Sequence, residues 1–125
     1  VYLLDTPRST DAVDKSLETI TTIINQYGGD EPEIELTMLE REVEFGQIHD
    51  YVRTAITTVQ DRGGEVAVDI TPGRKFMSAI VFTAGVRYDA DHVFYLYVAS
   101  TDHFGVSYPK IPRTATDLYD FTEEL

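Results

Sequence analysis

Two apolar patterns alternate along the chain, and this alternation constrains the fold more than any other feature. Short runs rich in β-branched residues predict strands, and segments with apolar residues three and four positions apart predict amphipathic helices. Strands that alternate with helices imply a parallel sheet with right-handed crossovers. The predicted strands are Val1–Leu4, Ile34–Leu39, Val66–Ile70 and His92–Ala99.

Three helices are expected between these strands. The first two end at glycine pairs that begin at Gly28 and Gly63, as helices do when glycine follows the C-terminus. The third helix is predicted from about Pro72 to about Arg87. It is apolar on nearly every side, so we expect it to be covered by the sheet and by a second subunit.

Two further elements are expected after the fourth strand. Phe104–Tyr108 predicts an antiparallel edge strand, and Thr116–Leu125 predicts the beginning of another helix. The chain is therefore expected to be an α/β protein. Its predicted architecture is Rossmann-like, with a mainly parallel sheet, helices on both faces and an antiparallel edge strand.

The length of 125 residues fits one domain over 1–125. The chain begins at Val1, without a methionine and already inside a strand-like run. We therefore expect that a first βα unit is missing at the N-terminus, and that the domain is also truncated at the C-terminus.

The charge balance is strongly acidic, with a net charge of −12 and only three lysines. Such a surface is typical of proteins from salt-loving organisms, although an ordinary acidic cytosolic protein is the alternative. General binding to DNA is not expected. No apolar run approaches the roughly 20 residues that span a bilayer, and we expect no signal peptide, so a cytoplasmic protein without membrane contact is expected. The absence of cysteine excludes disulfides and thiolate chemistry.

The turn after the third predicted strand, Thr71–Lys75, is the principal candidate site. Thr71 can cap a helix, Pro72 suits a first helical position, and Gly73 lets a ligand approach the backbone closely. Arg74 and Lys75 place two cations in the first helical turn, where the helix dipole disfavours them. An anionic ligand would offset that cost, because free N–H groups at a helix N-terminus favour phosphate.

An ordinary structural turn is the alternative for the same residues. The turn has neither the Walker spacing nor the G-x-G-x-x-G pattern, and Asp69 is expected to hold it through backbone N–H groups. The histidines show no metal-ligand spacing relative to one another. The acidic residues Glu40, Glu42 and Glu44 are expected to be solvated instead of binding a metal.

The eleven residues Asp69–Ala79 resemble the strand-4 signature of CARF domains, the CRISPR-associated Rossmann fold. In that family an apolar strand ends in Asp or Asn, followed by Thr, Gly or Pro, Gly, a small or basic residue, Lys, and Met two residues later. The layout of Val1–Asp5, Ile34–Leu39 and His92–Ala99 is similar to that of strands 2, 3 and 5 of the family.

This resemblance implies a homodimer that binds a cyclic oligoadenylate, the second messenger of type III CRISPR defence, across its two-fold axis. Thr71 and Gly73 would contact the ligand through a hydroxyl and a backbone N–H, and Lys75, with Arg74, would neutralise a phosphate. Some members also cleave the ring through attack of a 2′-hydroxyl on the neighbouring phosphate. Lys75 is then the candidate catalytic residue, and the chemistry requires no metal or other cofactor.

The chain departs from the family pattern because it shows no strand 1, which lies beside strand 4 in that layout. Val66–Ile70 is therefore expected to have one unpaired side. In an alternative assignment Val1–Asp5 is itself strand 1, and Thr6 and Ser9 are the ligand-loop hydroxyls. A sensor, a ring nuclease and an interaction module with a purely structural turn all remain open.

Overall fold

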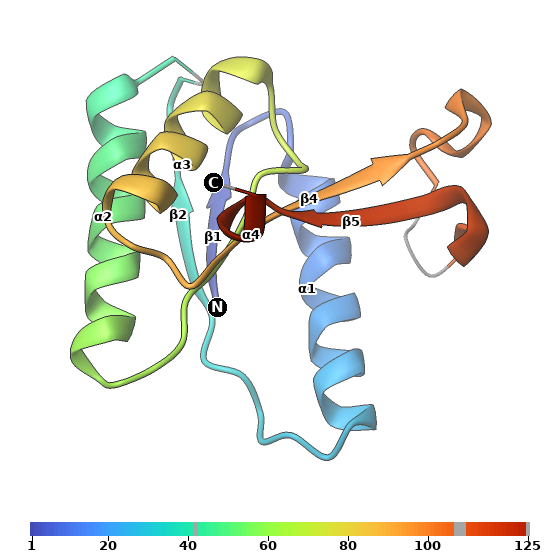
Figure 1. Cartoon of the computed structure of the whole chain (residues 1–125), viewed down its shortest axis with the longest axis horizontal. Helices are drawn as coiled ribbons and strands as arrows, with labels where there is room; N and C mark the ends of the chain where they lie inside the picture. Colours follow the sequence, from blue (N-terminus) through green and yellow to red (C-terminus); the bar gives the residue numbers. More distant parts are fainter. Residues whose placement is uncertain (42, 107–109, 125) are drawn as a thin grey trace. The chain divides into compact units, whose positions relative to one another are not determined.

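The computed structural model describes residues 1–41, 43–106 and 110–124 (Figure 1). Strands and helices alternate along it, which confirms the expected α/β class. In chain order the elements are β1 (Tyr2–Asp5), α1 (Thr10–Gln26), β2 (Glu35–Met38), α2 (Phe45–Asp61), β3 (Ala67–Asp69), α3 (Lys75–Arg87), β4 (His92–Val98), the 3₁₀ turns η1 (Thr101–His103) and η3 (Arg113–Ala115), β5 (Thr116–Asp120) and α4 (Phe121–Glu124).

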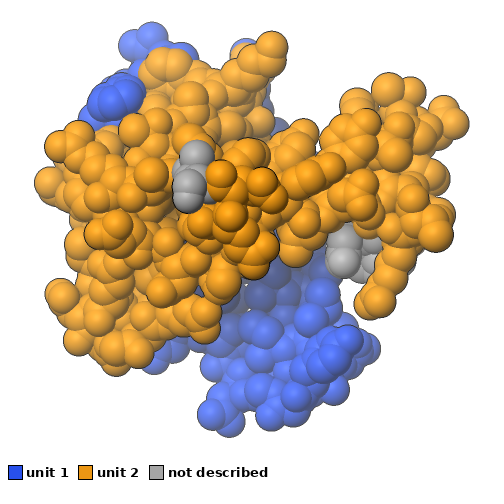
Figure 2. Space-filling view, in the orientation of Figure 1, with its two compact units in different colours: residues 1–47 blue, residues 48–125 orange. Residues whose placement is uncertain are grey.

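The chain divides into two compact units, Val1–Gln47 and Ile48–Leu125, coloured separately in Figure 2. In the first unit β1 and β2 form a two-stranded parallel sheet, in register from Tyr2 opposite Glu35 to Asp5 opposite Met38. Helix α1 packs on β1 and buries Val13. The turn after α1 passes through Gly28, whose φ of +75° is the left-handed conformation that glycine adopts readily.

The second unit contains a three-stranded sheet in the order β3-β4-β5. Strand β4 is parallel to β3 and antiparallel to β5. Helix α3 packs on β3 and β4 at Gly85, where an added Cβ would lie 3.0 Å from Cγ2 of Val93. Helix α4 contacts β4, and the Phe121 ring meets Phe82 of α3 edge-on at 5.3 Å between centroids.

The apolar core of the second unit includes three residues from α2. Ile48, Val52 and Ile56 of this helix recur four residues apart on one face and are all buried. A polar contact fixes the other end of α2, where Nε2 of Gln60 donates to the carbonyl oxygens of Tyr88 and Asp89 at 2.9 and 3.1 Å. The remaining buried apolar residues of this unit are Val66, Ile80, Ala84, Ala90 and Val93.

The sheet differs from the expected single one, because the described strands form two small sheets. Strand β3 pairs with β4 alone among the described strands, so one side of β3 is unpaired there. Its residues Ala67 and Asp69 are exposed, although the β-branched run Val66–Ile70 has the composition of a sheet interior.

The prediction for the C-terminal part was wrong. Residues Thr101–His103 form η1 and 104–106 a turn, so the described part of Phe104–Tyr108 is not a strand; residues 107–109 lie outside the described chain. The antiparallel partner of β4 is Thr116–Asp120, which was expected to be helical. Cross-strand pairs explain the difference, because Tyr119 faces Tyr95 and Leu118 faces Leu96. Within the described part of that segment, residues 116–124, only Phe121–Glu124 is helical.

No helix within residues 1–41, 43–106 and 110–124 has both the length and the apolar character that crossing a membrane requires.

Candidate functional site

The turn between β3 and α3 is closed by side chains of its own. Oδ1 of Asp69 accepts a hydrogen bond from the Thr71 N–H at 2.9 Å, the turn-holding role expected for this carboxylate. Gly73 has a φ of +97°, a left-handed conformation that a side chain would strain. The turn therefore requires glycine at this position for its backbone conformation.

Where the chain leaves β3, the hydroxyl groups of Thr71 and Ser78 make hydrogen bonds in place of regular strand-to-strand bonds. The Ile70 N–H still donates to Phe94 O at 2.9 Å, as in a regular parallel pair. Beyond that point the Leu96 N–H donates to Oγ1 of Thr71 at 2.8 Å, and Oγ of Ser78 donates to Ile70 O at 3.1 Å. The two hydroxyl groups bond the Leu96 N–H and the Ile70 carbonyl, which a longer strand would pair. The chain can therefore turn into α3 without leaving that backbone donor or acceptor unpaired.

Helix α3 begins later than the sequence predicted. Its N-cap is Arg74, with extended φ and ψ of −78° and 160°, and Lys75 is the first helical residue. The predictions of Thr71 as the helix cap and Pro72 as the first helical residue are wrong. The reason is a tertiary contact, because the Thr71 hydroxyl oxygen accepts a hydrogen bond from the Leu96 N–H of β4.

The cations of the turn face solvent. Arg74 and Lys75 are both exposed, and Lys75 has no carboxylate partner among the described residues. The first turn of α3 contains no acidic residue, so the positive end of the helix dipole and Lys75 add to one another. In a chain of net charge −12 this is a local reversal of sign that would attract an anion.

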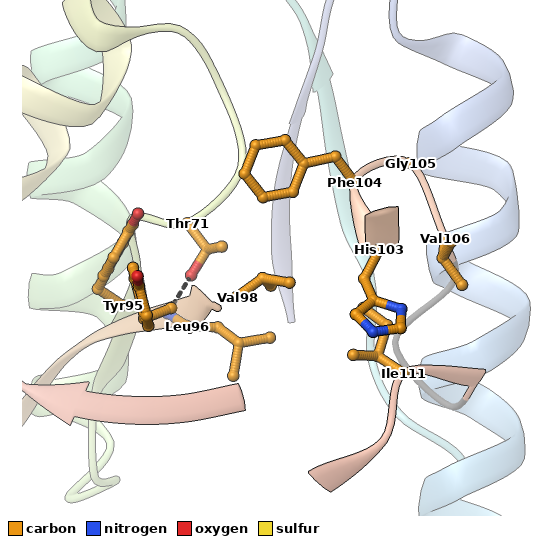
Figure 3. A pocket seen from close by; sticks show the side chains of 10 residues that line it. Thr71, Tyr95, Leu96, Val98, His103, Phe104, Gly105, Val106 and Ile111 are labelled. Atoms are coloured by element: carbon orange, nitrogen blue, oxygen red, sulfur yellow. Dashed lines mark hydrogen bonds between the residues drawn. The ribbon is translucent and has the colours of Figure 1, made fainter. Parts of the chain in front are cut away.

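A hollow of about 430 Å³ adjoins the turn at Thr71 (Figure 3). One wall comes from Thr71 and from β4, and the other comes from the segment that follows β4. In Figure 3 the Phe104 ring reaches from that second wall toward Thr71. The lining residues are Thr71, Tyr95, Leu96, Tyr97, Val98, His103, Phe104, Gly105, Val106 and Ile111.

The alternative ligand-loop hydroxyls, Thr6 and Ser9, lie in the first unit at the end of β1. Oδ1 of the buried Asp5 accepts from the Thr6 N–H at 2.7 Å and from Oγ of Ser9 at 2.8 Å. The two hydroxyl groups are themselves 3.0 Å apart, and Thr6 is buried. Hydrogen bonds among Asp5, Thr6 and Ser9, just before α1, therefore explain the positions of both hydroxyl groups without a ligand.

A cluster of ionisable groups lies at the opposite end of β4. Nδ1 of His92 is 2.6 Å from Oδ2 of Asp120, and Nε2 is 2.8 Å from Oε1 of Glu65. The hydrogen bond to Asp120, supported by the one to Glu65, raises the pKa of His92. Burial alone would raise the pKa of Asp120, but hydrogen bonds from His92, from Thr122 and from the Val93 N–H together hold that pKa well below its usual range.

No metal site is evident in the parts of the chain that the structure describes, where no group of three His, Asp or Glu side chains could hold an ion. Glu42 of the acidic loop lies outside those parts.

The chain matches no protein-family model, and it matches no curated protein sequence. The likeness of Asp69–Ala79 to the CARF signature is therefore an expectation carried by those residues alone.

Two features of the site were missed from the sequence. The hollow depends on residues far apart in the chain, and its only local signal was the pair His103-Phe104 just after a strand. The His92–Asp120 pair was missed because Asp120 lies in β5, which was predicted to be helical.

Proposed function

We propose that this chain is a nucleotide-sensing domain of type III CRISPR defence, which binds a cyclic oligoadenylate in the cleft of a homodimer. One observation carries the proposal. The turn Thr71–Lys75, which lies within the eleven residues that resemble the family signature, presents exposed cations at a helix N-terminus. Lys75 has no carboxylate partner among the described residues. Backbone N–H groups and a lysine at one helix end are the elements of an anion site.

Each residue of the turn has a role in this proposal. Thr71 donates its hydroxyl hydrogen to a phosphate oxygen while its oxygen accepts from Leu96. Gly73 allows the phosphate to approach the backbone, and Lys75 and Arg74 supply positive charge. Pro72 restricts the backbone just before Gly73. Thr6 and Ser9 have no ligand-binding role in this proposal, because both are bonded to Asp5.

The proposal includes a Rossmann-like, doubly wound arrangement with helices on both faces of the sheet, and a cytoplasmic protein. It also includes the dimer, for which exposed apolar side chains offer contact area. In the second unit these include Phe76, Tyr95, Tyr97, Leu118 and Tyr119.

The direct test is isothermal calorimetry with cyclic tetra-adenylate and cyclic hexa-adenylate, run in molar KCl because the chain is so acidic. Saturable binding of either ring, with one ring per two chains, is expected. Linear tetra-adenylate ending in a 2′,3′-cyclic phosphate, which also has four phosphodiesters, is the matched control for charge, and it should bind more weakly because its ordering costs more entropy. If neither ring binds while the protein is folded, the proposal is wrong.

A ring nuclease at the same site is the second candidate, favoured by the exposed amino group of Lys75 beside the turn. Lys75 would stabilise the charge that develops as a 2′-hydroxyl attacks the adjacent phosphorus and the 5′-oxygen leaves. Products ending in a 2′,3′-cyclic phosphate, detected by mass spectrometry and lost in Lys75→Gln, are expected. Binding without turnover would leave sensing alone.

The third candidate is an interaction module with a purely structural turn. The bonds made by Asp69, Thr71 and Ser78 favour it, because they account for this turn without a ligand. Failure of every nucleotide to bind the folded protein is the result expected from such a module.

A further inference from the structure

We propose that Glu65 is a pH-controlled gate over the His92–Asp120 pair of the second unit. While the His92 ring has a proton on both nitrogens, Glu65 is bound to it. When the ring loses its Nε2 proton, Glu65 leaves and Nε2 becomes a free acceptor, whereas Asp120 stays bound at Nδ1. The gate is independent of the proposed function, because His92 begins β4 and the turn at Thr71 lies beside the other end of that strand.

The contacts of the His92 ring require two N–H groups. Nδ1 lies 2.6 Å from Oδ2 of Asp120, and Nε2 lies 2.8 Å from Oε1 of Glu65. Both partners are carboxylates, which only accept hydrogen bonds when they are ionised. The cationic ring has a donor on each nitrogen, whereas a neutral ring has one N–H and one lone pair. Loss of a proton therefore leaves one carboxylate oxygen facing a lone pair, and that contact is repulsive.

Asp120 is the partner that keeps its hydrogen bond to the ring. Its side chain is only 9% exposed. Its Oδ1 also accepts from the Val93 N–H at 3.2 Å and from the N–H and hydroxyl of Thr122 at 3.1 and 2.7 Å. Moving this carboxylate would leave those donors unpaired. The proton that remains on a neutral ring is therefore held at Nδ1, because the hydrogen bond of one ring nitrogen sets the tautomer.

Glu65 is the partner that can leave. Its side chain is 72% exposed, and its carboxylate makes no other hydrogen bond to the described residues. Water can therefore replace the imidazole as the partner of Glu65, and no buried group loses a bond when the side chain moves.

Phe94 holds the His92 ring in place when the gate opens. The two rings are stacked, with 5.2 Å between their centroids and 6° between their planes. The His92 side chain is 35% exposed, so Nε2 meets water once Glu65 has moved away. An imidazole that donates Nδ1–H to a carboxylate and presents a bare Nε2 is arranged to accept a proton or a hydrogen bond from a hydroxyl group or water.

The other acidic groups of the neighbouring elements are bonded elsewhere or exposed. Oδ2 of Asp91, which directly precedes β4, accepts from the Val66 N–H at 2.7 Å. Asp69 of β3 holds the Thr71 N–H. The exposed acidic residues of α4 are Glu123 and Glu124.

The cations of α3 lie on the other face of the sheet. Val93 points toward α3, since an added Cβ at Gly85 would meet its side chain. Successive residues of a strand point to opposite faces, so His92 points away from α3. The charged residues placed on that other face are Lys75 and Arg87 of α3 and Asp117 of β5, opposite Tyr97.

The test is an NMR titration of the isotope-labelled full chain from about pH 5 to about pH 10, a range that brackets the usual titration of histidine. The hydrogen bonds to Asp120 and to Glu65 raise the pKa of His92, so the gate should open above the ordinary value of 6.5. The ¹⁵N shifts of the ring should show loss of the Nε2 proton with the Nδ1 proton retained. At the same midpoint the χ1 couplings of Glu65 should change from those of one rotamer to averaged values, whereas those of Asp120 should stay constant.

Glu65→Gln is the informative variant, because an amide can donate to a bare Nε2 and can also accept from a cationic ring. The new side chain should keep one rotamer across the whole titration. The midpoint of His92 should fall by about one pH unit or more, because a neighbouring opposite charge is removed. Glu18→Gln removes the same charge from an exposed position on α1, and should leave the midpoint and the Glu65 couplings as they are in the parent protein.

Four results would overturn the proposal. The first is a neutral ring that keeps its proton at Nε2, and the second is a Glu65 side chain whose couplings do not follow the His92 midpoint. The third is a ring that keeps both protons up to about pH 10, well beyond the usual range of histidine. The fourth is an equal fall of the midpoint in Glu65→Gln and Glu18→Gln, which would reflect net charge alone.

Discussion

His92 and Asp120 form a short charged pair that fastens β5 to β4, with Nδ1 of His92 only 2.6 Å from Oδ2 of Asp120. The other ring nitrogen, Nε2, forms a hydrogen bond with Oε1 of Glu65, just before β3. Asp120 in turn accepts from the N–H and the hydroxyl of Thr122, at the start of α4. One imidazole therefore connects the segments on both sides of β4.

This pair should make stability depend on pH. The folded-state pKa of His92 is raised, so its contribution is complete below the unfolded value of about 6.5 and is lost as pH rises through the folded pKa. The folded-state pKa of Asp120 is lowered, so its contribution is present above about 3.9 and is lost only as pH falls below that. The difference in melting temperature between the parent protein and His92→Gln should be largest near pH 5–6 and shrink toward pH 9.

His103→Gln is the control for that experiment, because its ring has no hydrogen bond to the described residues. Its melting temperature should differ from the parent value by the same small amount at every pH. A constant gap for His92→Gln across the range would contradict the pairing.

Gly85→Ala should destabilise the second unit. The new Cβ would lie 3.0 Å from Cγ2 of the fully buried Val93 and 3.8 Å from Val68. Overpacking of this kind costs about 1–3 kcal/mol, and the better helix propensity of alanine returns only about 1 kcal/mol. Urea unfolding should show a net loss of up to about 2 kcal/mol.

Gly46→Ala is the matched change in α2, where nothing lies within 4 Å of the added Cβ. It should leave the free energy of unfolding unchanged or raise it by about 0.5–1 kcal/mol. If both alanines stabilise the protein equally, α3 does not pack on the sheet as closely as described.

Thr71→Val should destabilise the fold by about 1–2 kcal/mol, because it leaves the Leu96 N–H without its acceptor. Thr71→Ser keeps the oxygen and should lose much less. The comparison separates the hydrogen bond from the β-branched shape of the side chain. Equal free energies of unfolding for the two variants would show that the bond contributes nothing.

Lys75→Gln should weaken cyclic oligoadenylate binding about tenfold or more, the usual worth of a charge-assisted hydrogen bond. Lys15→Gln removes the same charge from an exposed position on α1 and should leave affinity unchanged. Calorimetry at two KCl concentrations should also show a weaker salt dependence for Lys75→Gln than for Lys15→Gln. Equal losses in both variants would indicate a response to net charge alone.

The sequence predicted the strands and helices up to β4, because their apolar periods are strong and glycine follows the first two helices. It also predicted that Asp69 holds the turn, since a short carboxylate bonds nearby N–H groups. The start of α3 was misplaced because capping rules do not foresee that a strand amide, Leu96, takes the Thr71 hydroxyl oxygen. Thr116–Asp120 was misassigned because its pairing with β4 is a tertiary effect. The His92 cluster depends on that same pairing and had no local signal. The hollow brings Thr71 and β4 together with residues farther along the chain, and its only local signal was the pair His103-Phe104.

The hydrogen bond from Leu96 to Thr71 makes one backbone amide a natural reporter of the turn. A ligand that accepts the Thr71 hydroxyl hydrogen would polarise its oxygen and tighten its hold on the Leu96 N–H. Exchange of that single amide with deuterium would then slow on binding, whereas an event that pulls the turn off the sheet would speed it. The exchange rate of the Leu96 amide could thus report whether a ligand is bound at the turn, without a label on the ligand.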